Sequence, residues 1–99
     1  MKSNKIRNAA RGKPCTLQIV GVCNGNTETT VLAHLPDESN GMGKKSDDIS
    51  ACFACSSCHD AIDSRGKMPE SEKPFIEWYM RRAMVRTWRM LIDDGVIKL

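Results

Sequence analysis

The chain has 99 residues and a mass of 11.0 kDa, which is enough for one small domain. Hydrophobic residues make up 40% and aromatic residues 5%, so the core is thin and a metal, a disulfide or a partner chain should help to stabilise it. A charged fraction of 27% without low-complexity tracts excludes a disordered tail, and no apolar run approaches the roughly 20 residues that span a bilayer. Residues 1–13 lack the apolar stretch of a signal peptide, so the sequence predicts a cytoplasmic protein with no membrane partner.

The net charge of +3 is unevenly distributed along the chain. Residues 1–14 carry basic side chains and no acid, residues 15–63 are acidic, and residues 64–99 are basic again. Taken alone, this distribution favours an ordinary solvated surface. Basic flanks around an acidic segment that holds Cys and His are also the pattern of a metal site that acts on a polyanion.

The first half of the chain predicts short elements. A polar arm is expected to be helical over residues 4–11 and to stop at Pro14. Residues 15–23 are β-branched and roughly alternating, which predicts a short strand or a knuckle, and the Asn-Gly-Asn that follows is a strong turn signal. Residues 29–34 predict a second strand. The Gly-rich stretch 36–48 is expected to be a functional loop.

The second half predicts one more short strand and two helices. Residues 49–54 predict a third strand, and residues 55–65 predict a knuckle that runs into a short helix. A longer helix should extend from Ser71 to Gly95, with both tryptophans in its buried stripe. The residues expected to form that stripe recur at steps of three and four: Phe75, Trp78, Tyr79, Arg82, Val85, Trp88, Leu91 and Ile92.

The cysteines carry the sharpest chemical signal. There are five, and an odd count in a reducing compartment argues against a disulfide framework. Cys55 and Cys58 have the spacing that brings two thiolates within about 2.3 Å of one tetrahedral ion, and Cys15 with Cys23 supplies a second pair. We therefore expect these four sulfurs to bind a structural zinc ion that stabilises an undersized core, with inert buried thiols as the alternative.

Other interpretations of the cysteines stay open at this level. Cys52 and Cys55 form an overlapping pair with the same spacing, although a buried Cys52 within a strand is favoured. The run from Cys55 to His59 also matches the attachment motif of c-type haem, and its two cysteines match a thioredoxin-like pair. Haem attachment would leave Cys15 and Cys23 unexplained, and the βαβ setting of a thioredoxin is absent.

Two histidines are the candidates for chemistry. His34 ends the second predicted strand and His59 follows the Cys-x2-Cys pair. A lone His is usually structural, but a strand–loop–strand–helix unit pinned by zinc would bring these two together. An imidazole and a carboxylate suit a divalent metal at a phosphodiester, and a second imidazole can deprotonate water. Acids lie nearby in the sequence: Asp47, Asp48, Asp60 and Asp63.

This pattern resembles a known family. A strand ending in Leu-Ala-His34, a Gly-rich loop and a Cys-x2-Cys-His59 that runs into a helix are similar to the HNH (ββα-metal) endonucleases, and more closely to the small prophage-encoded nucleases typified by YbcO. The segments that carry the likeness extend over nearly the whole chain and are specific together: Ala-Ala-Arg-Gly at 9–12, Gly-Val-Cys-Asn-Gly-Asn at 21–26, Val-Leu-Ala-His at 31–34, Ala-Cys-Ser-Ser-Cys-His-Asp at 54–60, Ile-Asp at 62–63 and Gly-Val-Ile-Lys at 95–98.

The resemblance implies an α+β fold in three parts. A basic N-terminal arm would occupy residues 1–14, a zinc-bound ββα-metal core residues 15–66, and an amphipathic helix packed on the core residues 67–99. It also implies metal-dependent cleavage of DNA phosphodiester bonds that leaves a 5′-phosphate. His34 would be the general base, His59 would ligate a catalytic Mg²⁺ or Mn²⁺, and the structural zinc would lie where related proteins hold it, at Cys15, Cys23, Cys55 and Cys58.

The chain departs from the family at two positions. Many members have Asp as a metal ligand just before the first His, where this chain has Ala33. The middle Asn of the HNH name has no Asn here, and Asp48 is the candidate by position. Asp60 is the carboxylate expected to complete the catalytic metal site, with Asp63 as the alternative.

DNA is the expected partner, and a phage or host recombination or replication protein is a further one. The alternatives to a nuclease are a zinc-knuckle module that binds nucleic acid without catalysis and an accessory protein for phage recombination. Basic side chains from the arm, the loop and the last helix are expected to contact the phosphates: Lys5, Arg7, Arg11, Lys13, Lys44, Lys45, Arg81 and Arg86.

Overall fold

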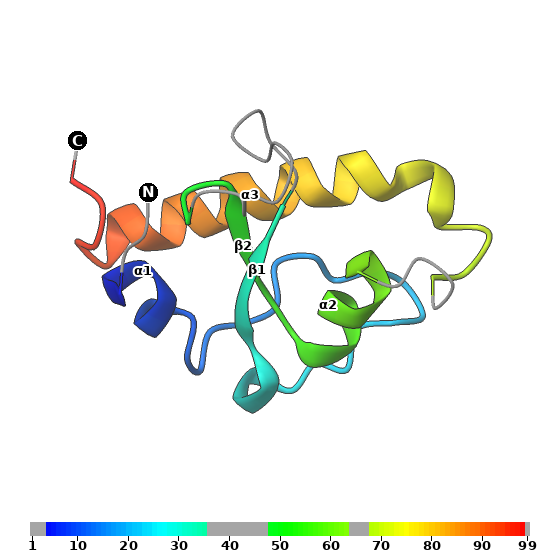
Figure 1. Cartoon of the computed structure of the whole chain (residues 1–99), viewed down its shortest axis with the longest axis horizontal. Coiled ribbons are helices and arrows are strands. Elements are labelled where there is room, and N and C mark those ends of the chain that lie inside the picture. Colours follow the sequence, from blue (N-terminus) through cyan, green and yellow to red (C-terminus); the bar gives the residue numbers. More distant parts are fainter. Residues whose placement is uncertain (1–3, 36–47, 64–67, 99) are drawn as a thin grey trace.

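A computed structural model describes residues 4–35, 48–63 and 68–98. Its α+β architecture has a two-stranded sheet that crosses beneath one long helix (Figure 1). Shorter helices lie to either side of the sheet. Lys44 and Lys45 fall outside the described residues. The elements in chain order are α1 (Asn4–Ala9), η1 (Thr27–Thr29), β1 (Val31–His34), β2 (Ala51–Ala54), α2 (Ser56–Asp63), η3 (Lys73–Phe75) and α3 (Ile76–Asp93).

The two strands are those that the β-branched segment 29–34 and the segment 49–54 predict. They pair antiparallel, with Val31 opposite Ala54 and His34 opposite Ala51. This pairing places His34 at the end of β1, next to the beginning of β2. All four residues of β2 are buried, whereas β1 has exposed and half-buried positions. Of the two strands, β2 is therefore the more deeply buried.

The predicted first strand over residues 15–23 is wrong, and its alternative, a knuckle, is correct. Gln18 and Gly21 have positive φ angles of 47° and 78°, which break an extended run. The backbone N–H groups of Val22 and Cys23 then both donate to the carbonyl of Ile19, at 3.0 Å each. The alternation of side chains over residues 15–23 does not predict this turn, because the same residue pattern is compatible with both a strand and a tight turn.

The free edge of β2 is closed by two threonines. The N–H and hydroxyl groups of Thr16 both donate to the carbonyl of Phe53 at 2.8 Å, and the N–H of Phe53 donates to Thr87 Oγ1 at 3.0 Å. The two hydroxyl oxygens lie 3.3 Å apart. The hydroxyls of Thr16 and Thr87 thus satisfy buried backbone groups that would otherwise lack partners at this edge.

We expect Thr87→Val to lower the free energy of unfolding by about 1–3 kcal/mol, because it leaves the buried N–H of Phe53 without an acceptor. Urea denaturation followed by circular dichroism measures this change. Thr30→Val is a matched control, since Thr30 is also buried and its hydroxyl has no hydrogen-bond partner among the described residues. An equal loss in both variants would contradict the role given to Thr87.

Helix α3 confirms the predicted helix and, in part, its predicted buried stripe, because Tyr79 and Leu91 are buried as expected. Its buried residues are Tyr79, Ala83, Thr87 and Leu91, spaced by four. Trp78 is 52% exposed, so its predicted place in the core is wrong. Trp88 is half-buried and donates its indole N–H to the carbonyl of Ile49 at 2.9 Å. In the middle of the buried stripe, Ala83 is small and Thr87 is β-branched, and these two residues allow close approach of the helix to β2.

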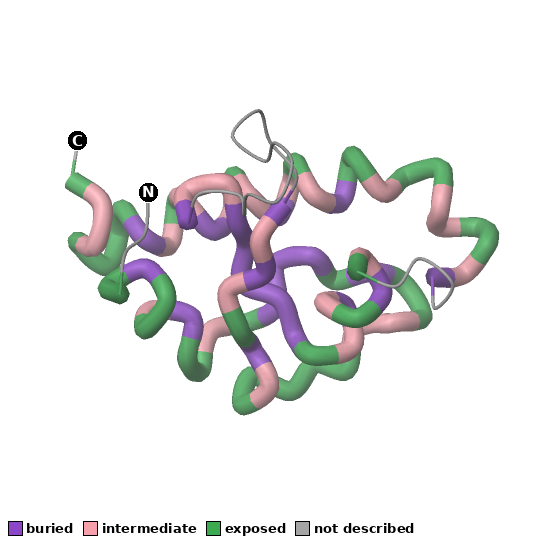
Figure 2. Tube along the Cα trace, viewed as in Figure 1, coloured by how far each residue is buried: buried purple, intermediate pink, exposed green. Residues whose placement is uncertain are grey.

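Two apolar clusters make the core, and they meet at the sheet (Figure 2). The larger joins the knuckle, the cysteines, α2 and the first half of α3. The smaller joins Ile6 and Ala10 of the N-terminal segment to Phe53 and Leu91. Helix α1, which confirms the helix expected near residues 4–11, is therefore packed against the rest of the chain. The division of the chain at residues 14 and 66 stays a prediction.

Among the described residues, no helix is both long enough and apolar enough to cross a membrane.

Candidate metal centre and catalytic cleft

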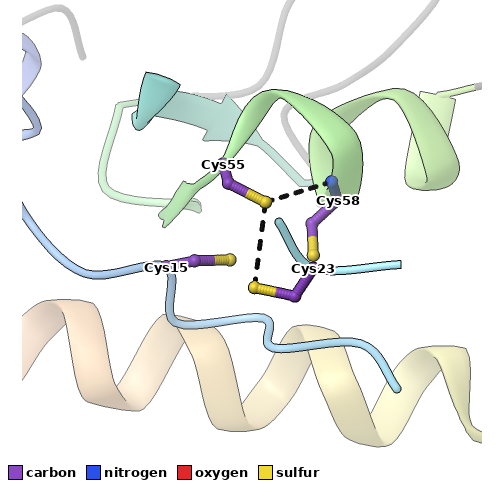
Figure 3. Close-up of side chains that lie close together, drawn as sticks. All are labelled: Cys15, Cys23, Cys55 and Cys58. Carbon is purple, nitrogen blue, oxygen red and sulfur yellow. Dashed lines mark hydrogen bonds between the residues drawn. The ribbon is translucent and has the colours of Figure 1, made fainter. Parts of the chain in front are cut away.

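Four cysteines converge between the knuckle and α2. The sulfur atoms of Cys15, Cys23, Cys55 and Cys58 all lie within 4.8 Å of one another and point toward a common centre (Figure 3). A tetrahedral site with Zn–S bonds of about 2.3 Å needs sulfurs roughly 3.8 Å apart. The sulfurs of Cys55 and Cys23 are 3.9 Å apart. The four-sulfur set predicted from the sequence is thus brought together and fits a zinc ion.

Local backbone structure holds these thiols in place. Cys55 immediately precedes α2 and Cys58 lies in its first turn, where the N–H of Cys58 donates to Cys55 Sγ at 3.4 Å. The left-handed Gln18 turns its own N–H toward Cys15 Sγ, at 3.5 Å. Such N–H···S bonds stabilise thiolates and orient them as ligands.

The cysteines of the cluster differ in pKa: that of Cys15 is lowered, whereas burial raises that of Cys23. Hydrogen bonding to Cys58 lowers the pKa of Cys15 to about 4, while that contact and burial raise the pKa of Cys58. One thiol of the cluster therefore readily becomes a thiolate. Burial raises the pKa of Cys52 to about 12. Cys52 lies within β2 opposite Ala33 and outside the cluster, so the overlapping Cys52/Cys55 pair is not the one that the fold brings to the site.

A cleft of about 1530 Å³ lies beside the metal centre and contains both histidines. His34 reaches it from the end of β1, and His59 and Asp63 reach it from α2. Lys73 and Arg81 line the same cleft from the side of η3 and α3. The strand–strand–helix unit therefore brings both histidines to the lining of one cleft.

A buried carboxylate orients His34. Asp48 Oδ1 lies 2.7 Å from His34 Nε2, and the guanidinium of Arg7 donates to both carboxylate oxygens, at 3.2 and 3.4 Å. The Asp48 side chain is 1% exposed and that of His34 is 30% exposed. A buried anion is thus compensated by Arg7 on one side and His34 on the other. The contact between Asp48 and His34 comes from the fold, since the sequence offered Asp48 only as the candidate by position for the middle Asn of the HNH name.

His59 has its own acidic neighbour. His59 Nε2 lies 3.1 Å from Asp63 Oδ2, one helical turn later on α2. Both Asp60 and Asp63 are exposed, but Asp63 lines the cleft and Asp60 is absent from the described lining. Of the two acids that the sequence offers, the fold brings Asp63 and not Asp60 to His59.

The predicted phosphate-contacting residues separate into three groups. Arg11 and Arg81 line the cleft, as does Arg7, although Arg7 is engaged with Asp48. Lys13 pairs with Asp94, and Arg86 donates to Gln18 Oε1 at 3.1 Å. The remaining described residue of the set, Lys5, is on the exposed side of α1.

Two features of the site have no clear sequence signal. Arg7 and Asp48 are 41 residues apart, and nothing in their spacing indicates an ion pair. Lys73 also lines the cleft, where it pairs with Glu70 at 2.6 Å. By contrast, the pairing of His59 with Asp63 could have been found from their i, i+4 spacing on a predicted helix.

The chain is similar to known proteins over nearly its whole length. The family described as "Putative nuclease YbcO" matches residues 4–96. A protein of that description from Escherichia coli (strain K12) is 43% identical over 94 residues, covering 94% of this chain and 96% of its own. One from Enterobacteria phage 82 gives the same values. A solved "putative bacteriophage protein" of Escherichia coli K-12 superposes with a TM-score of 0.71 at 40% identity, covering 92% of this chain and all of its own. The chain belongs to the YbcO nuclease family.

Proposed function

We propose that this protein is a metal-dependent, HNH-type endonuclease that hydrolyses DNA phosphodiester bonds. The single observation that supports this most is the His34–Asp48 pair, which opens onto a cleft that also holds His59 and Asp63. An oriented imidazole, a second imidazole and a carboxylate in one accessible cleft are the groups that phosphodiester hydrolysis needs.

His34 is the general base of the proposed reaction. When Nε2–H donates to the Asp48 carboxylate, Nδ1 carries a lone pair and can accept a proton from water. Asp48 also stabilises the imidazolium that forms, because its carboxylate lies 2.7 Å from the ring and is paired with Arg7. Arg7 positions Asp48 and is not itself the base.

His59 and Asp63 would hold the catalytic Mg²⁺ or Mn²⁺. A divalent ion in such a site stabilises negative charge on the phosphate and on the leaving oxygen. Asp63 is the better candidate ligand than Asp60, because it already lies beside His59 in the cleft. Ala33 supplies no carboxylate, so the metal site depends on α2. Arg11, Lys73 and Arg81 would bind the flanking phosphates.

A plasmid-nicking assay tests the proposal. Zinc-loaded protein should convert supercoiled DNA to the open circle when Mg²⁺ or Mn²⁺ is added, and should be inactive when these ions are withheld. Withholding is preferable to EDTA, which would compete for the thiolate site. His59→Ala and Asp63→Asn should lose the metal-dependent cleavage at unchanged zinc content, whereas Asp60→Asn on the same helix should retain it. Cleavage that is indifferent to His59 would contradict the assignment.

A non-catalytic module that binds nucleic acid is the second candidate, and Ala33 is the residue that favours it. It predicts that zinc-loaded wild type shifts DNA on a gel but gives no open circle with either ion.

A further inference from the structure

The end of η3 and the outward face of α3 expose large apolar side chains outside the cleft. Phe75, Trp78, Val85 and Ile92 are 54%, 52%, 36% and 38% exposed. An exposed aromatic ring beside other exposed apolar side chains often marks an interaction site. Neither the metal centre nor the catalytic cleft uses this face.

Trp78 is held in a fixed orientation. The guanidinium of Arg82 lies over its ring, 4.3 Å from the ring centre, and the ring of Tyr79 meets it edge-on at 5.2 Å and 68°. Arg82 is itself anchored, because it donates to the carbonyl of Leu17 at 2.8 Å. The indole is therefore a rigid plate, supported by a cation and open to solvent over about half of its surface.

Cations outnumber acids on α3, although Glu77 stands next to Trp78. All four cations of α3 lie in its middle, at Arg81, Arg82, Arg86 and Arg89, and its two acids lie at its ends, at Glu77 and Asp93. Arg81 also lines the catalytic cleft and is three residues from Trp78, so the two side chains are neighbours on the helix surface. A polyanion that leaves the cleft past Arg81 would meet Trp78 next.

We propose that Trp78, backed by Arg82, is a stacking platform for an unpaired base in a single-stranded DNA segment next to the cleft. Single-strand binding sites combine a basic track for the phosphates with exposed aromatic rings for the bases, and this face has both. In a duplex the bases are stacked on one another and are not free to stack on the indole ring. The inference rests on the proposed function of the cleft and specifies its substrate as DNA with a single-stranded part.

A second copy of this chain is a poorer occupant of the same face. Pairing α3 with itself would bring the four central arginines of one copy near those of the other, without an acid in the middle of the helix to compensate them. Charge complementarity therefore favours a polyanion.

Binding of labelled oligonucleotides, measured by fluorescence anisotropy without Mg²⁺ or Mn²⁺, tests the platform. Trp78→Ala should weaken binding of a single strand by about five- to 150-fold, the range for loss of one base–aromatic stack. Binding of the matching duplex should change by less than about twofold. Trp78→Phe, which keeps a ring, should retain most of the affinity, and Val85→Ala is the control for an exposed apolar residue of the same face. Quenching of tryptophan fluorescence by single strands should diminish in Trp78→Phe.

Equal weakening for single strands and duplex, or no weakening for either, would overturn the inference. So would a wild-type dimer in sedimentation velocity that Trp78→Ala dissociates. The result is independent of catalysis. A chain that nicks plasmid but binds single strands equally well without Trp78 would refute the platform and leave the nuclease standing. A chain that binds single strands through Trp78 but cleaves nothing would support the platform and refute the nuclease.

Discussion

Cys58→Ala should abolish zinc binding and the cooperative unfolding transition of this protein. Structural zinc contributes about 10–16 kcal/mol in small zinc-binding folds at neutral pH, which is as large as the whole stability of a typical domain. The four cysteines join the knuckle to α2 and lie within the larger core cluster. Loss of one thiolate therefore removes the ion and separates the halves of that cluster. Metal analysis and thermal melts followed by circular dichroism measure both effects.

Cys52→Ala is the matched control for this experiment. Cys52 and Cys58 are both 0% exposed, so the two variants make the same chemical change at equal burial. Cys52→Ala should keep one zinc ion and lose only roughly 1–2 kcal/mol, because it leaves a small cavity and no unpaired ligand. If Cys58→Ala kept its zinc and melted as Cys52→Ala does, the four-sulfur site would be refuted.

His34→Ala should lower the rate of plasmid nicking by about 10²- to 10⁴-fold, which is the usual contribution of a general base. Zinc content should remain that of the wild type, because His34 lies outside the four-sulfur cluster, whereas the melting temperature should fall, because the buried Asp48 carboxylate loses a partner. Added imidazole should restore part of the rate, since it can take the place of the missing base in a cleft that is open to solvent.

Two further variants distinguish the role of His34 as the base from the role of Asp48, which orients it. Asp48→Asn should give a smaller loss of nicking than His34→Ala, because it removes the charge that orients the ring and leaves the ring itself. Thr30→Val, which lines the same cleft, should nick at the wild-type rate. A His34→Ala protein as active as the wild type would exclude His34 as the base, whatever the effect of Asp48→Asn.

The cysteine ligands and the helices could be predicted because their signals are local. Two cysteines with two residues between them define half of a metal site within one turn of chain, and the fold supplies only the distance to the other pair. The periodicity of residues 71–95 indicated a helix for the same reason. Its buried face was predicted only in part: Tyr79 and Leu91 are buried as expected, whereas Trp78 is exposed and the hydroxyl of Thr87 takes a place beside β2.

The sequence by itself thus determined the residue types that this chain can use for chemistry: four thiols, two imidazoles and a few acids. The tertiary structure decided which of them meet. It joined Asp48 to Arg7 and His34, and it turned Asp63 rather than Asp60 toward His59. The physical reason is that ion pairs and cleft walls depend on packing between segments distant in the chain. Successive residues of a helix are rotated by about 100° around its axis, so acids only a few positions apart can lie on different faces.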